Sequence, residues 1–286
     1  MKKVFALFLF VATFFSASAQ FEVGISPGIS FYTGDIAPNT QLTSSGPVNF
    51  TIGTFARYQF HPNLAARINF AWANISGDDA KAQDRGRRNR NLSFSSQILE
   101  VSLIGEVLFP PVEEIGYIPP FQAYVFGGIG WFHFNPQTEF QGNTVDLQPL
   151  GTEGQGLPGF PARYSLNELA VPVGIGAKFG IAPRLSLGIE YGVRVTFTDY
   201  LDDISTVYVN PAELAAGNGS LAAELAFRGD ELPGRDISNE NLTGRQRGSA
   251  DYNDFYHIST VSLIYHFGNG SIGGFGGGRG GKCYKF

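Results

Sequence analysis

The chain has 286 residues, and charged residues make up only 16% of it, against about 25% in an ordinary soluble protein. The net charge of −5 disfavours a nucleic-acid-binding protein, and an aromatic content of 14% disfavours a disordered chain. The single Cys283 excludes an internal disulfide framework, and a mean hydropathy of −0.03 with one long apolar run excludes a polytopic helical membrane protein.

The first residues have the form of a secretory signal peptide. Lys2 and Lys3 precede an apolar run that ends in Ala17-Ser18-Ala19, an A-x-A cleavage site. A retained membrane anchor is the alternative, but the run is short for a span of about 20 residues. Since no cysteine follows the cleavage site, a lipoprotein is excluded. We therefore predict that residues 1–19 are removed on export, which leaves a mature chain with a net charge of −7 once the two lysines are subtracted.

Eight segments after this leader alternate apolar and polar residues, as β-strands with two different faces do. Each is long enough to cross a bilayer as a tilted strand, which takes about 9–11 residues. Segment 185–198 shows the clearest alternation, whereas 121–134 is aromatic and glycine-rich on both faces. In chain order the segments are 21–32, 48–60, 64–72, 97–109, 121–134, 167–180, 185–198 and 255–267.

The connections between these segments alternate in length. Those after the second and sixth strands are tight, at 61–63 and 182–184, and the proline-rich connection at 110–120 is moderate. The others are long, and the last covers 199–254, with a short helix expected within 211–227. Short turns on one side and long loops on the other are typical of outer-membrane barrels.

The predicted fold class is therefore all-β: an eight-stranded antiparallel transmembrane β-barrel, an OmpA-like up-and-down meander over residues 20–267. The long loops are expected to be extracellular, with both termini in the periplasm of a Gram-negative bacterium. A soluble β-sandwich or lipocalin-like barrel is the alternative, and its apolar face would point inward.

The polar faces of the predicted strands carry four acidic and four basic residues. Eight strands leave an interior just wide enough for side chains, and each charge enclosed there needs a partner. We therefore predict a plugged barrel, not an open porin, with a lumen charge network formed by Glu22, Arg57, Arg67, Glu100, Glu106, Lys178, Glu190 and Arg194.

The last predicted strand closes with alternating apolar residues and an aromatic end. This pattern resembles the signal that the outer-membrane assembly machinery reads, and here it consists of Val261, Leu263, Tyr265 and Phe267. An ordinary amphipathic strand is the alternative. A glycine-rich basic tail follows at 268–286, with a reach of about 24 Å if it is flexible. It is expected to be periplasmic, and either contacts a partner, with Cys283 available to pair with a thiol, or is an inert linker.

Four stretches at the loop ends carry a family resemblance. They are Arg90–Phe94 (RNLSF), Phe132–Gln137 (FHFNPQ), Val145–Gly156 (VDLQPLGTEGQG) and Thr196–Ser205 (TFTDYLDDIS). Together with the leader and the glycine-rich end they resemble the PorG-like family of outer-membrane β-barrels, over nearly the whole mature chain. The resemblance implies a non-enzymatic component of the type IX secretion system that associates with periplasmic ring proteins. A structural or adhesive OmpA-like barrel without secretion partners is the alternative.

A basic cluster lies in the second long loop, and it contains Arg85, Arg87, Arg88 and Arg90. Such arginines could bind lipopolysaccharide phosphates at the outer face. The alternative is a solvated loop with Asp78, Asp79 and Asp84 as counter-charges, and it is the one we favour.

Two further patterns indicate chemistry only weakly. His257 and Ser259 could serve as base and nucleophile of a lipid A-modifying enzyme, but no carboxylate is assignable to orient the histidine. Asp199, Asp202 and Asp203 could bind calcium, but they lack the spacing of a calcium loop, and hydrogen bonds that cap the loop are the preferred interpretation. We expect no catalytic activity, cofactor or metal.

Overall fold

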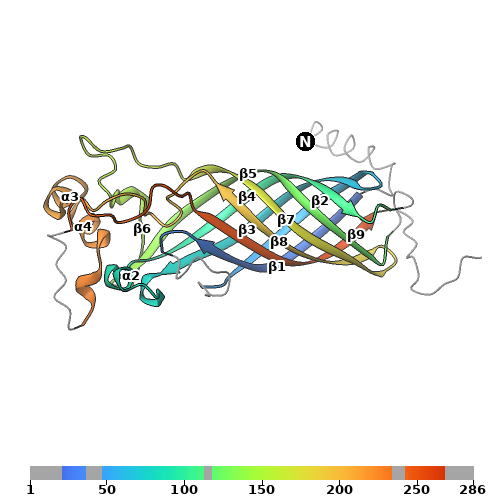
Figure 1. The fold of residues 1–286 in the computed structure, drawn as a ribbon, viewed down its shortest axis with the longest axis horizontal. Coiled ribbons are helices and arrows are strands. Elements are labelled where there is room, and N and C mark those ends of the chain that lie inside the picture. The colour runs from blue at the N-terminus through green and yellow to red at the C-terminus, as the bar shows by residue number, and fades with distance from the viewer. Residues whose placement is uncertain (1–20, 37–46, 113–117, 234–241, 268–286) are drawn as a thin grey trace, which may run out of the picture.

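The computed structural model describes residues 21–36, 47–112, 118–233 and 242–267, and these form a closed antiparallel β-barrel with long loops at one end (Figure 1). The expected leader at 1–19 and the tail at 268–286 lie outside the described residues. Eight strands make the wall: β1 (Phe21–Thr33), β2 (Asn49–His61), β3 (Leu64–Asp78), β4 (Ser93–Phe109), β5 (Phe121–Phe140), β7 (Asn167–Ala182), β8 (Leu185–Thr196) and β9 (Phe255–Phe267).

Each strand pairs with its neighbours in the chain, and β1 pairs with β9 to close the barrel. Where β1 pairs with β9, Phe21 lies opposite Phe267, at the end of the barrel that carries the tight turns. The predicted eight-stranded meander is confirmed. Closure leaves no open sheet edge, so every strand of the wall has a partner on both sides.

Three strands are longer on the loop side than the sequence predicts. β3 continues to Asp78, β4 begins at Ser93, and β5 continues to Phe140. The end of β5 also pairs with a ninth, short strand, β6 (Asn143–Asp146), which lies outside the closed barrel. Alternation is irregular in these extensions, so the apolar pattern did not reveal them, but the ladder between β3 and β4 continues without interruption.

The outer face of the wall is apolar. On β2, the exposed aromatic residues Phe50 and Phe60 mark the two borders of this apolar face. On β5, the exposed residues Phe121 and Trp131 do the same. In each pair the residues are ten positions apart, which at about 3.4 Å per residue and a tilt of about 40° gives roughly 26 Å. That distance matches the apolar band of about 25 Å between the aromatic girdles of membrane barrels. A soluble barrel would not expose such a band.

Short helices and turns cover the loop end of the barrel (Figure 1). They are η2 (Asp79–Lys81), α2 (Arg85–Arg90), η3 (Gln148–Leu150), α3 (Pro211–Asn218), α4 (Ser220–Ala226) and η4 (Gly229–Glu231). The helix expected within 211–227 is present as α3 and α4, separated by Gly219, whose φ of 98° ends α3. We call the described residues of 79–92, 147–166 and 197–254 the cap.

None of the helices in the described ranges is long and apolar enough to span a membrane.

The barrel interior has two tiers. Near the tight turns it is polar and charged, and glycines make room for rings there, since a Cβ at Gly174 or Gly176 would overlap Phe126 or Tyr124. Near the loops it is an apolar core that continues into the cap. The largest fully buried residues of this upper tier include Ile75, Ile98, Phe132, Phe134 and Tyr256.

Candidate functional site

The lower tier is built around Arg57, whose side chain is fully buried. Its Nη1 donates to Glu22 Oε2 at 2.6 Å and its Nη2 to Glu106 Oε1 at 2.9 Å. The guanidinium also lies over the rings of Phe55 and Tyr124, at 4.9 and 5.3 Å from the centroids. Two carboxylates and two aromatic faces therefore compensate one buried cation.

The ion pairs continue from Arg57 in both directions. Arg67 lies 3.1 Å from Glu106 and 2.7 Å from Glu190, each measured from a guanidinium nitrogen to a carboxylate oxygen. Lys178 Nζ lies 3.0 Å from Glu22 Oε1. Six side chains from six strands thus form one unbroken chain across the lumen, ordered Lys178, Glu22, Arg57, Glu106, Arg67 and Glu190.

A separate pair lies closer to the apolar tier. Arg194 Nε donates to Glu100 Oε2 at 3.1 Å, and Tyr256 Oη donates to the same oxygen at 2.8 Å. The structure therefore places all eight residues of the predicted charge network inside the barrel, and each of the four cations contacts a carboxylate.

The lumen is filled where these pairs lie. A cavity of about 30 Å³ beside Arg67 and Glu190 has room for about one water molecule. Asn69 Oδ1 and Arg67 Nη2, both buried next to it, have no hydrogen-bond partner among the described residues, so a water there would satisfy both. This geometry can hold a rigid, closed wall, and within the described residues the charged pairs fill the lumen at this level.

A second polar network lies inside the cap, and no pattern in the sequence predicts it. Arg90 is buried, with its Nε 2.7 Å from Asp79 Oδ2 and its Nη2 donating to the Asp35 carbonyl at 2.9 Å. The expectation that Arg90 is solvated was therefore wrong, because its side chain turns inward, but Asp79, one of the counter-charges expected from the sequence, is its partner.

The other arginines of that cluster lie on α2. Arg85 is exposed and Arg87 is half-buried, while Arg88 Nη1 donates to the Ala82 carbonyl at 2.8 Å. Asp84 caps the helix by accepting from the Arg87 amide at 2.9 Å, and the acceptance of backbone hydrogen bonds lowers the pKa of Asp84. The exposed positive charge at this place is thus smaller than four arginines would give.

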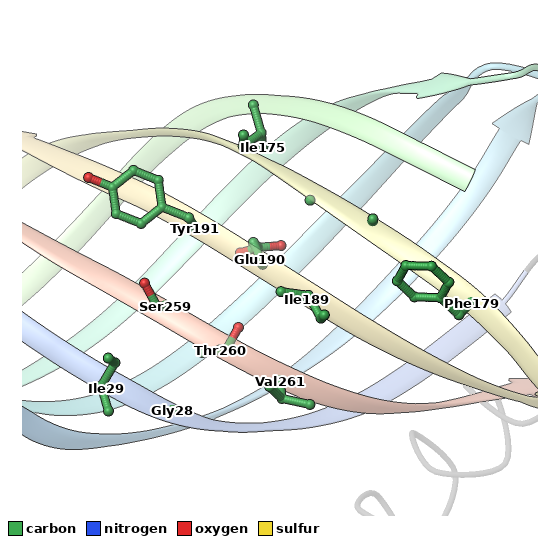
Figure 2. A pocket seen from close by; sticks show the side chains of 12 residues that line it. Gly28, Ile29, Ile175, Phe179, Ile189, Glu190, Tyr191, Ser259, Thr260 and Val261 are labelled. Atoms are coloured by element: carbon green, nitrogen blue, oxygen red, sulfur yellow. The ribbon is translucent and has the colours of Figure 1, made fainter. Parts of the chain in front are cut away.

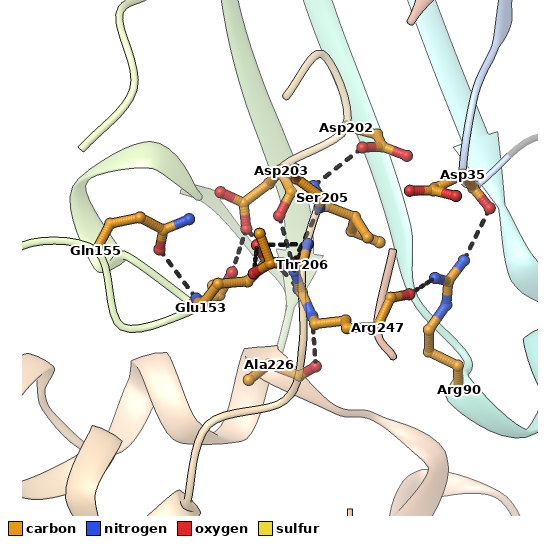
Figure 3. Close-up of polar contacts among 12 residues, drawn as sticks. Asp35, Arg90, Glu153, Gln155, Asp202, Asp203, Ser205, Thr206, Ala226 and Arg247 are labelled. Atoms are coloured by element: carbon orange, nitrogen blue, oxygen red, sulfur yellow. Dashed lines mark hydrogen bonds and ion pairs between the residues drawn. The ribbon is translucent and has the colours of Figure 1, made fainter. Parts of the chain in front are cut away.

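Arg247 is the other cation of the cap network (Figure 3). Its Nη1 lies 2.9 Å from Glu153 Oε1 and 2.8 Å from the Asp203 carbonyl, and its Nε donates to the Ala226 carbonyl at 3.1 Å. Glu153 also accepts from the backbone amides of 205 and 206, at 3.0 Å each. One buried arginine therefore fastens the last long loop to the third.

The three aspartates considered for calcium, Asp199, Asp202 and Asp203, serve as hydrogen-bond acceptors, which is the interpretation preferred from the sequence, and Asp199 does so with Ser205 as its partner. Asp202 Oδ1 accepts from the Ile204 amide at 3.0 Å, and Asp203 Oδ1 accepts from Tyr164 Oη at 2.7 Å. Burial raises the pKa of Asp203 to about 6 and that of Asp199 to about 8. No group of three or more His, Cys, Asp or Glu side chains in the described ranges is arranged to hold a metal ion.

The residues proposed for an enzyme do not form a base and nucleophile. His257 Nδ1 lies 3.0 Å from Tyr191 Oη and its Nε2 lies 3.2 Å from Thr33 Oγ1, so both ring nitrogens are occupied. The ring stacks on Phe31 at 4.4 Å between centroids. Ser259 instead lines a groove of about 620 Å³ in the barrel wall (Figure 2). No hydrogen bond joins Ser259 to His257 in the part of the chain that the structure describes.

The residues of the predicted assembly signal lie on the outward face of β9. Phe267 ends this strand, and its ring packs against Phe21 and Tyr265, at 5.4 and 5.0 Å between centroids. Val261 and Leu263 are each 53% exposed, so they point away from the barrel interior. The alternating row therefore borders the seam that closes the barrel.

A family model described as "Domain of unknown function (DUF6089)" matches residues 2–153. No curated protein matches the chain. Among solved structures, the chain is similar to Neisserial surface protein A, with 8% identity over 86% of this chain and 97% of that one and a TM-score of 0.41. It is also similar to the attachment invasion locus protein Ail of Yersinia pestis in complex with a heparin analogue, with 10% identity, 87% and 98% coverage and a TM-score of 0.39. A major outer membrane protein from Thermus thermophilus has 17% identity, 86% and 99% coverage and a TM-score of 0.37.

Proposed function

The chain belongs to the family described as Domain of unknown function (DUF6089), and from this premise we propose that it is a non-enzymatic outer-membrane barrel that anchors or assists type IX protein secretion. The observation that carries the proposal is the filled lumen. Because charged pairs occupy the interior, the barrel itself is not a route for cargo, and its two ends are what it offers to other molecules.

Outer-membrane placement is supported by the wall. A closed barrel satisfies every backbone hydrogen bond without water, as a bilayer requires, and its exposed aromatic rows are spaced for the apolar band. The export leader expected at 1–19 would bring the chain to that membrane. The capped end with the long loops then faces outward, and the tight turns face the periplasm.

The anchoring role is supported by the difference between the two ends. At the turn end, the exposed residue His61 and the half-buried Pro62 and Asn63 leave a short, rigid edge on which periplasmic ring proteins could dock. The tail at 268–286 would start from the same end. The secretion role itself is supported by the resemblance to the PorG-like family. Lipopolysaccharide and other outer-membrane lipids would surround the wall, and no nucleic acid is expected as a partner.

Deletion of the gene, followed by mass spectrometry of the medium and the cell surface, tests this role. Loss of type IX cargo that the intact gene restores would support it. Complementation with a chain ending at Phe267 then separates docking through the tail from docking through the turns. Unchanged secretion in the deletion strain would refute the role and leave the structural or adhesive function, for which the cap is the surface to study.

A further inference from the structure

Tyr32 stands between two carboxyl groups where the cap meets the barrel. It is buried at the end of β1, and its Oη lies 2.7 Å from Asp202 Oδ2 and 2.7 Å from Asp254 Oδ1. Asp202 belongs to the last long loop, and Asp254 directly precedes β9. Both aspartates are buried as well, at 1% and 0% exposure. One hydroxyl therefore joins three segments that are far apart in the sequence.

The hydrogen atoms at this place can be counted. A phenol has one hydrogen to donate, and an ionised carboxylate only accepts. The Tyr32 oxygen also accepts from the Asp35 amide at 3.0 Å. With both aspartates ionised, one carboxylate oxygen would face a lone pair of Tyr32 at 2.7 Å. One of the two carboxyl groups must therefore be protonated and donate to the tyrosine oxygen.

The backbone contacts indicate which carboxyl group holds the proton. Asp202 accepts from two amides, those of Ile36 at 2.9 Å and Ile204 at 3.0 Å, and both favour its ionised form. Asp254 accepts from one amide, that of Leu201, at 2.9 Å and through its other oxygen. Asp254 Oδ1 is thus free to donate to Tyr32, which in turn donates to Asp202.

From this geometry we infer that Asp254, Tyr32 and Asp202 form a buried proton-binding site, and that the bound proton holds the cap closed on the barrel. The inference does not depend on the role in secretion. Loss of the proton would leave two carboxylates on one hydroxyl in a buried place, and the strain is relieved when the loop that carries Asp202 moves away from β1.

The surrounding charges favour retention of the proton. Asp35 from the loop after β1 adds negative charge, whereas Asp199 from the last loop, with its pKa raised to about 8, adds negative charge only above that pH. The facing cation, Arg90 of α2, is already paired with Asp79 at 2.7 Å. Burial, followed by the charge of Asp35, raises the pKa of Asp202 to about 7, and burial with the charge of Asp202 raises that of Asp254.

The sign of the pH effect follows from these directions. The closed cap binds a proton more tightly than the open cap, in which the carboxyl groups regain their ordinary value of 3.8. Closure is therefore favoured at acid pH and is lost as the pH rises from 3.8 towards the raised pKa of the pair formed by Asp202 and Asp254. For one proton, the opening equilibrium grows about tenfold per pH unit in this window.

Amide hydrogen exchange of the full chain in lipid vesicles tests the inference. Exchange of residues 199–205 is followed at pH 5, 6 and 7, with times scaled by an unstructured reference peptide. We expect protection to fall by at least about tenfold per pH unit in the natural protein, and to fall about tenfold less steeply per pH unit in Asp254→Asn, in which Asp203 and Asp199 still titrate. The asparagine donates permanently to Tyr32 and still accepts from the Leu201 amide. The matched control is Asp251→Asn, an exposed position in the same loop that should keep the natural slope.

A natural protein with level protection, or an Asp254→Asn variant that keeps the natural slope, would overturn the inference. If Asp254→Asn does not fold, infrared spectroscopy of a variant with both Asp199→Asn and Asp203→Asn gives the answer, since Asp254 and Asp202 are unchanged there and the raised carboxyl groups of Asp199 and Asp203 are removed. A protonated-carboxyl band at pH 6 that disappears at pH 9 is the expected result. Absence of that band at pH 6 would contradict the inference.

Discussion

The lumen and the cap bury charge in opposite ways. In the lumen, four carboxylates meet four cations, and every cation contacts a carboxylate. In the cap as the structure describes it, six buried carboxyl groups face two buried arginines. They are Asp79, Glu153, Asp199, Asp202, Asp203 and Asp254, with Arg90 and Arg247 as the cations. The balanced lumen should be insensitive to pH and permanently closed, whereas the excess of acid makes the cap the part that responds to pH.

Removal of the central lumen cation should have the largest effect. Arg57→Met leaves Glu22 and Glu106 buried without their shared partner, and breaking such a pair costs about 3–5 kcal/mol. The measurement is unfolding of the whole barrel by urea in lipid vesicles. Arg85→Met, at an exposed position of α2, is the control and should change stability by less than about 0.5 kcal/mol. Equal stability of the two variants would mean that the lumen pairs do not hold the barrel together.

Removal of a cap cation should have a smaller and local effect. Arg247→Met takes away the charged partner of Glu153, which keeps its backbone donors at 205 and 206. We expect cap closure to lose about 1.5–3 kcal/mol, while the urea midpoint of the barrel stays unchanged. Amide hydrogen exchange of the cap and of β4, measured in one experiment, separates the effect on cap closure from the effect on the barrel. Loss of protection in β4 as well would show that the cap and barrel unfold as one unit.

The pH response of the cap can be divided among its carboxyl groups. Burial raises the pKa of Asp203 from 3.8 to about 6, so its contribution to closure is complete below about pH 4 and is lost as the pH rises to about 6. In Asp203→Asn, protection of residues 152–164 should decline less steeply across this range than in the natural protein. Tyr164 can still donate to the amide oxygen. A decline as steep as in the natural protein would assign the effect to other groups.

The smallest expected effect concerns the wall. Ser259→Ala should leave the mass of lipid A unchanged, because His257 is held by Tyr191 and Thr33 and forms no hydrogen bond with Ser259 within the described residues. Mass spectrometry of lipid A from strains with the natural gene, the variant and the deletion is the measurement. A mass that shifts both in the deletion and in the variant would restore the enzymatic interpretation.

The lumen could be predicted from the sequence because strands have a strict period of two. In segment 185–197 the apolar residues occupy every second position and face outward. Glu190 and Arg194 lie on the alternate positions, so they must face inward, and a narrow lumen forces such charged residues to pair with others. The upper apolar tier was missed because Phe132 and Phe134 point inward beside Trp131 on the outward phase, so both faces of that segment are aromatic.

The cap could not be predicted in this way, because loops have no period that fixes side-chain directions. Arg247 and Glu153 are 94 positions apart, and nothing in the local sequence of either residue indicates the other. Arg90 belongs to a run of basic residues that suggests an exposed position, yet its side chain is buried and donates to Asp79. Only the fold, which brings the loop after β1, α2 and the last loop over one opening, reveals these contacts.

Single-channel recording in planar bilayers tests the difference between lumen and cap most directly. The balanced charge network predicts that the natural protein shows no porin-sized conductance at pH 5, and none at pH 8 even when hydrogen exchange shows an open cap. A stable, porin-sized open state at either pH would contradict the filled lumen and with it the proposal that this barrel is an anchor.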